Sequence, residues 1–71
     1  MGLSPSDAAK LALKYLADEL TDEEKKILKT LIRTGSIRSA SWKLFGTLHK
    51  RYVIRRLLKK CLREVYEKLS K

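Results

Sequence analysis

Apolar residues recur along this chain at intervals of three and four positions, which is the spacing of a buried helix face rather than of a strand. Short polar segments with Ser, Thr or Gly interrupt the pattern. The pattern predicts four helices, at about residues 5–20, 22–34, 37–45 and 48–69. Because the connections are short, we expect an all-α fold, a compact bundle of three to four helices that forms one domain over residues 1–71.

The ends of the second helix carry clear local signals. Thr21 and Glu24 have the spacing of a capping box, in which each side chain bonds the backbone N–H of the other residue. Gly35 follows the last turn, where glycine takes the left-handed conformation that ends many helices. Ser4 before Pro5 would start the first helix, because proline suits the first helical position. These residues predict where the first two helices begin and where the second ends.

Each expected helix has an apolar side that would face a shared core. The inward-facing residues expected in the first two helices are Ala9, Ala12, Leu13, Tyr15, Leu16, Leu20, Ile27, Leu28, Leu31 and Ile32. Those expected in the last two are Ile37, Ala40, Leu44, Trp42 or Phe45, then Ile54, Leu57, Leu58, Cys61, Leu62, Val65 and Leu69. Aromatic residues at helical spacing are usually core residues, so we expect Trp42, Tyr52 and Tyr66 inside, with stacking on bases as the alternative.

The charges are distributed unevenly along the chain. Its formal net charge is +9, yet residues 25–63 contain thirteen Lys and Arg and no Asp or Glu. Six acids lie in residues 1–24, and the other two, Glu64 and Glu67, follow the basic segment. Such a segment repels itself, whereas a surface that is charged only for solubility normally mixes both signs. The sequence therefore predicts a partner that supplies negative charge.

The last helix concentrates this charge on one side. On a helical wheel its basic residues lie opposite its apolar residues, and the preceding helix adds two more cations. Lys and Arg on one face can neutralise several phosphates, and the counterions released provide most of the non-specific affinity for nucleic acid. The candidate nucleic-acid-binding residues are Arg38, Lys43, His49, Lys50, Arg51, Arg55, Arg56, Lys59, Lys60 and Arg63.

Residues 35–58 resemble the helix-turn-helix superfamily. The segment similar to the first helix and turn of that unit is Gly35-Ser36-Ile37-Arg38-Ser39-Ala40-Ser41-Trp42-Lys43-Leu44-Phe45-Gly46-Thr47, and the segment similar to its recognition helix is His49-Lys50-Arg51-Tyr52-Val53-Ile54-Arg55-Arg56-Leu57. The resemblance implies a helix-turn-helix-like core with a turn at Gly46, packed on the second helix, and DNA rather than RNA as the partner. The chain lacks Asn and Gln, which usually recognise adenine, so we expect phosphate contacts with low sequence specificity.

Two other functions agree with the same residues. In size, charge and composition the chain resembles small basic accessory and chromatin proteins of archaea, including accessory subunits of replicative DNA polymerase holoenzymes and ribosome-associated proteins. This implies a subunit of a larger nucleic-acid machine. A basic amphipathic helix also suits an anionic membrane surface or a partner groove, and its wide apolar side would allow a homodimer. Of these partners, a membrane is expected least.

Catalysis and metal binding have little support in the residues. The chain has one His, one Cys and no glycine-rich phosphate loop, so we expect no enzyme activity, no cofactor and no metal site. A lone Cys61 is expected as a buried hydrophobic residue in a reducing compartment. Few thermolabile side chains and many charges are typical of proteins from hot environments. With no signal peptide or membrane span in the pattern, we expect a cytoplasmic protein, nucleoid-associated if its source is archaeal or bacterial.

Overall fold

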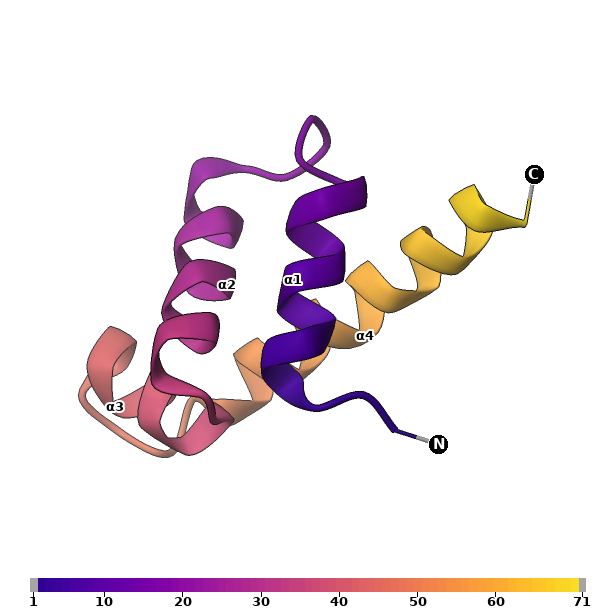
Figure 1. The fold of residues 1–71 in the computed structure, drawn as a ribbon. Coiled ribbons are helices and arrows are strands. Elements are labelled where there is room, and N and C mark those ends of the chain that lie inside the picture. Colours follow the sequence, from indigo (N-terminus) through magenta and orange to yellow (C-terminus); the bar gives the residue numbers. More distant parts are fainter. Residues whose placement is uncertain (1, 71) are drawn as a thin grey trace.

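A computed structural model describes residues 2–70 of the chain. Its helices are α1 (Pro5–Tyr15), α2 (Asp22–Thr34), α3 (Ile37–Phe45) and α4 (Arg51–Leu69), with no strand among the described residues. α1 contacts both α2 and α4, and α3 contacts α2 and α4. α4 crosses behind the other helices, and its C-terminal end extends past α1 (Figure 1). The expected all-α bundle is confirmed.

Local capping bonds set the boundaries of α2 and α3. Thr21 Oγ1 accepts the Glu24 backbone N–H at 3.1 Å, and Glu24 Oε1 accepts the Thr21 N–H at 2.9 Å, as the capping box predicted. The serine that precedes each of α1 and α3 accepts an N–H from the first turn. Gly35 and Gly46 end α2 and α3 at φ values of 81° and 68°, which are strained for residues with a Cβ. The predicted bounds 22–34 and 37–45 are therefore confirmed.

α1 is shorter than the sequence predicted, since it ends at Tyr15 rather than near residue 20. Leu16 caps the helix at φ −118°, and its carbonyl accepts the N–H groups of Glu19 and Leu20 at 2.9 and 3.1 Å. The apolar spacing continues through this turn because Leu16 is fully buried and Leu20 packs against the core. Apolar side chains thus stay packed on the core where the helix has already ended. Apolar periodicity does not distinguish a helix from a turn that packs on the same core.

α4 begins at Arg51, later than the predicted start at about residue 48. The buried Ser41 hydroxyl donates to the carbonyl of Thr47, and the Thr47 hydroxyl accepts the N–H of His49 at 3.1 Å. The Arg51 N–H bonds the Leu48 carbonyl at 3.3 Å instead of the Thr47 carbonyl, so no helix starts at residue 48 and residues 46–50 form a turn. The turn connects α3 with α4 and carries two of the predicted site residues.

Every helix contributes to one core. Three small residues of α1 are buried there, which lets the neighbouring helices approach closely. The buried apolar residues are Ala8, Ala9, Ala12, Leu16, Leu28, Leu31, Ala40, Ile54, Leu57, Leu58, Cys61 and Val65. Leu69 was predicted to join them, but it is 58% exposed because the last turn of α4 projects beyond α1 (Figure 1).

Candidate nucleic-acid interface

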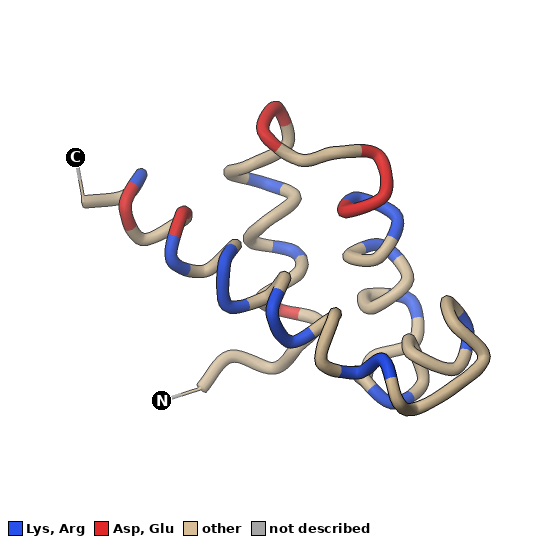
Figure 2. The backbone as a smooth tube through the Cα atoms, turned by 180° about the vertical axis from the view of Figure 1, so that it is seen from behind, with Lys and Arg blue, Asp and Glu red and all other residues tan. Residues whose placement is uncertain are grey.

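α4 has a buried side and a charged side. Its buried residues Ile54, Leu58 and Cys61 recur at helical spacing and belong to the core shared with α1. All the cations predicted on its opposite side are exposed: Arg55, Arg56, Lys59, Lys60 and Arg63. Figure 2 shows Lys and Arg recurring along α4, with Glu only toward its C-terminal end. The predicted basic side of the last helix is therefore present on the surface.

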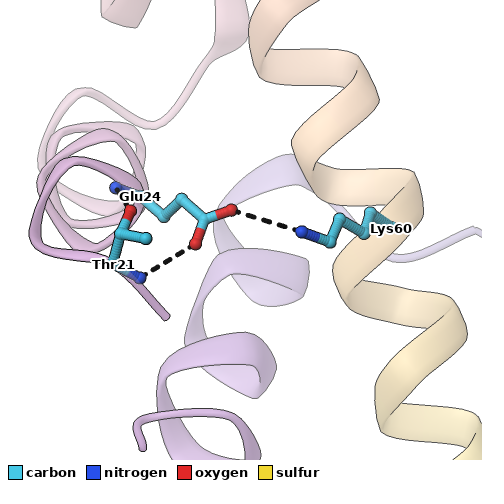
Figure 3. A network of polar contacts seen from close by, with 3 residues as sticks. All are labelled: Thr21, Glu24 and Lys60. Atoms are coloured by element: carbon cyan, nitrogen blue, oxygen red, sulfur yellow. Dashed lines mark hydrogen bonds and ion pairs between the residues drawn. The ribbon is translucent and has the colours of Figure 1, made fainter. Parts of the chain in front are cut away.

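The cations of α4 differ in what they contact. Lys60 Nζ lies 3.6 Å from Glu24 Oε2 of α2 (Figure 3). The Arg56 guanidinium lies over the Tyr52 ring, 5.8 Å from its centroid. Arg55, Lys59 and Arg63 form no ion pair with any described residue. We call these three residues the free triad. Their charges face solvent and are available to bind an anion.

The start of α4 is also positive. No side chain caps its first turn and no acid lies in it, in contrast to α2, whose first turn has a capping box and three acids. Arg51 donates from Nε to the carbonyl of Leu48 at 3.1 Å, and Lys50 lies over the Phe45 ring at 5.6 Å. The positive end of the helix dipole thus adds to these cations rather than opposing an acid.

A surface hollow of about 620 Å³ lies between α3 and the start of α4. Its lining residues are Trp42, Thr47, Leu48, His49, Arg51, Tyr52 and Arg55. The hollow therefore brings together three predicted site residues, His49, Arg51 and Arg55, and includes no acid. The other predicted α3 cations, Arg38 and Lys43, are exposed but do not line it.

The expectation that the three aromatic residues lie in the core is wrong. Trp42 and Tyr52 are each 55% exposed, and Tyr66 is 65% exposed. On α3 the buried positions belong to the small residues Ala40 and Ser41, whose size suits the close approach of neighbouring backbone. The sequence carries no local signal that Ser41 rather than Trp42 would take the buried place.

Most acidic residues lie on other elements than the free triad, but Glu64 and Glu67 follow Arg63 on α4. Figure 2 shows the acids mainly in the connection between α1 and α2, at the start of α2 and near the end of α4. Lys68 pairs with Glu19 and donates to the Tyr15 carbonyl at 3.1 Å, so the end of α4 is joined to the end of α1. The hydrogen bond from Lys68 lowers the pKa of Glu19 below its usual 4.5. Acids therefore occur on α4 only after the free triad, and residues 51–63 of the helix contain none.

Replacing Glu24 with Gln should weaken the fold at neutral pH and have less effect in acid. The Thr21 backbone N–H and the Lys60 charge hold the pKa of Glu24 below its usual 4.5 in the folded chain. The resulting stabilisation is complete above pH 4.5 and is lost as pH falls through the lower, folded pKa. We expect Glu24→Gln to lower the free energy of unfolding by about 1 kcal/mol at pH 7. The difference from wild type should narrow toward about pH 3.

Urea unfolding followed by circular dichroism at several pH values measures this effect. Glu23→Gln is the matched control, because it removes the same charge from the same helical turn, and Glu23 bonds neither Thr21 nor Lys60. If the difference in the free energy of unfolding between Glu24→Gln and wild type stays constant or widens in acid, the Glu24 charge does not stabilise the fold as described.

Cys61 and His49 do not form a metal site in the structure. Cys61 is buried, and burial raises the pKa of its thiol to about 11, so it stays protonated and is a poor ligand or nucleophile. Within residues 2–70 no three His, Cys, Asp or Glu side chains gather in a way that could hold a metal ion.

No helix in this part of the chain is long and apolar enough to cross a membrane.

Comparisons with known proteins do not assign this geometry to a family. No protein-family model matches the chain, and no curated protein or solved structure matches it significantly. The resemblance of residues 35–58 to the helix-turn-helix superfamily stays a prediction. The function of the basic surface is therefore argued from its own residues.

Proposed function

We propose that this chain is a small nucleic-acid-binding protein that holds DNA mainly through its phosphates, using the outer side of α4. The observation that supports this most directly is the free triad, whose three exposed cations form no ion pair with any described residue. Unpaired cations on one surface repel each other, and a phosphate backbone removes that repulsion while releasing its counterions.

The spacing within the free triad favours an extended anionic partner. Arg55, Lys59 and Arg63 follow each other at intervals of four residues, so they share one face and lie about 6 Å apart along the helix axis. A single small anion would contact one or two such side chains. A polynucleotide strand offers phosphates along the whole row, and the positive start of α4 extends it.

In this proposal α3, the turn at 46–50 and α4 act as a helix-turn-helix unit. α4 would lie along the duplex as the recognition helix, while Arg38 and Lys43 of α3 would contact the neighbouring backbone. Because the chain has no Asn or Gln, bidentate contacts with adenine are missing. Binding should therefore depend little on base sequence.

The salt dependence of duplex binding tests the proposal. Each phosphate contact contributes about 0.9 to the slope of log affinity against log salt concentration. With three to five cations engaged, we expect a slope of roughly −3 to −5, with similar affinity for duplexes of unrelated sequence. Fluorescence anisotropy of a labelled duplex between about 50 and 200 mM salt measures it. A slope near zero, or no binding at low salt, would overturn the proposal.

A second candidate is a subunit of a larger nucleic-acid machine, such as a polymerase holoenzyme or a ribosome. The observation that favours it is the partly buried Ile27, which lines two neighbouring surface concavities where α2 meets α3 and α4. Leu44 and Phe45 line one concavity, and Val53 and Leu57 line the other. A protein partner could cover these apolar side chains while the free triad still faces nucleic acid.

Pull-down of the tagged protein with and without nuclease separates the two candidates. A partner protein that is retained after nuclease treatment supports the subunit, whereas loss of all partners supports direct binding to nucleic acid. The membrane-surface alternative lacks a comparable observation, because the apolar residues along most of α4 are packed in the core.

A further inference from the structure

The hollow between α3 and α4 combines two kinds of side chain, exposed aromatic residues and basic residues. Trp42 and Tyr52 both line it and are both more than half exposed. His49, Arg51 and Arg55 line the same hollow. Single exposed aromatic residues are common on protein surfaces and need no explanation. Two of them around one concavity that three basic residues also line indicate a ligand with both an aromatic face and a negative charge.

We propose that this hollow binds an unpaired base of single-stranded nucleic acid, stacked on Trp42 and Tyr52, with the adjoining phosphates held by Arg51 and Arg55. The inference rests on the proposed function and extends it, since it adds an unpaired base to the phosphates that the protein contacts. In a duplex the faces of the bases are covered by their neighbours, and only the edges are accessible in the grooves. An unpaired base exposes its face, and stacking on an aromatic side chain replaces the lost neighbour.

The hollow is held in shape by contacts outside it. Ser41, next to Trp42, bonds the Thr47 carbonyl, and this bond fixes the turn that supplies Thr47, Leu48 and His49 to the hollow. Arg56 lies over the Tyr52 ring without being one of the lining residues of the hollow. Because the Ser41 bond holds the turn, a base would enter a hollow whose turn is already ordered and would bind at a lower ordering cost.

The residues of the hollow also agree with the missing amides of the chain. Stacking uses the face that every base has, so it needs no Asn or Gln to read base edges. The arginines lie beside the aromatic residues, where they can bind phosphate. A neutral apolar ligand would leave these arginines without a counter-charge. Their positive charge therefore favours a nucleotide chain over a neutral apolar ligand.

Three probes of equal length separate stacking from charge. They are an oligothymidylate of about 16 nucleotides, the matching duplex, and a single strand of abasic sites that keeps the phosphates but lacks bases. Trp42→Ala should lower the affinity for oligothymidylate by about fivefold to a hundredfold. Its affinity for the duplex and the abasic strand should stay within about twofold of wild type. Trp42→Phe, which keeps an aromatic face, should restore most of the loss.

Two further measurements make the assignment specific to the hollow. Tyr66→Ala removes an aromatic side chain that is exposed on α4 but does not line the hollow, and it should leave oligothymidylate binding unchanged. Trp42 is the only tryptophan, so its fluorescence should be quenched by oligothymidylate and not by the abasic strand. Oligouridylate, tested in parallel, supports the proposal as well if its binding also depends on Trp42.

The outcomes distinguish this inference from the function on which it rests. If duplex binding persists but Trp42→Ala has no effect on oligothymidylate, or Tyr66→Ala has an equal effect, the base site is wrong and phosphate binding stands. If the wild-type protein binds none of the three probes, both proposals are wrong. Circular dichroism verifies that each variant folds. We expect both variants to fold, because the side chains of Trp42 and Tyr66 are exposed.

Discussion

Reversing the free triad, as Arg55→Glu, Lys59→Glu and Arg63→Glu together, should abolish measurable nucleic-acid binding. All three side chains are exposed on the outer side of α4 and form no ion pair with any described residue. Each lost phosphate contact removes on the order of 1 kcal/mol, so affinity should fall by at least about a hundredfold. The three glutamates would then repel the backbone that the arginines and the lysine attracted.

The matched control is a reversal of equal charge on another helix. Lys26→Glu, Lys29→Glu and Arg33→Glu on α2 lower the net charge from +9 by the same six units, to +3. These residues are also exposed and lack ion pairs with described residues. We expect this variant to lose about tenfold or less, through the weaker long-range attraction.

Anisotropy titration of duplex DNA compares the two variants at one salt concentration. An equal loss in both would show that net charge, and not the outer side of α4, determines binding. Arg56 and Lys60 are left unchanged, because Arg56 packs on Tyr52 and Lys60 pairs with Glu24. Their reversal would alter the fold together with the surface. Both variants should keep the helical circular dichroism of the wild type.

Ile54→Ala should remove a large part of the stability of the fold. Ile54 is fully buried where α4 meets the core, and a truncation at such a site typically costs about 2–5 kcal/mol. A domain of this size buries a small core and has a free energy of unfolding of only about 5 kcal/mol. The variant should therefore keep a free energy of unfolding of only about 0–3 kcal/mol.

Urea unfolding monitored by circular dichroism measures the loss, and Leu69→Ala is the control on the same helix. Leu69 is 58% exposed, so its truncation should change the free energy of unfolding by no more than about 0.5 kcal/mol. Similar losses at both positions would contradict the difference in burial between Ile54 and Leu69. Ile54 and Arg55 are neighbours in the chain, so adjacent residues of one helix serve stability and binding separately.

Caps and helix faces could be predicted from the sequence because both depend on residues within one or two turns. The Thr21 and Glu24 bonds join positions three apart, and Gly35 and Gly46 take left-handed conformations that residues with a Cβ rarely adopt. The bounds of α2 and α3 followed from them. The periodic spacing likewise placed Ile54 inside and Arg55 outside on α4.

Only the tertiary structure decided where a segment with apolar spacing is no longer helical. It also decided which polar groups form hydrogen bonds or ion pairs. Leu20 stays against the core although α1 has ended at Tyr15. Trp42 is exposed because Ser41 takes the buried place beside it and bonds the turn before α4. These outcomes depend on groups that meet only after the helices pack, and no local pattern contains them.

The same division holds for the candidate site. The basic side of the last helix was evident from the sequence, because it needs only charge and helical spacing. Which cations are free was not evident, since Lys60 is engaged by Glu24 of a different helix (Figure 3). The hollow that joins Trp42 to Tyr52 likewise exists only through the turn between α3 and α4. Local chemistry determined the charge of the surface, and packing determined which part of it is left for a partner.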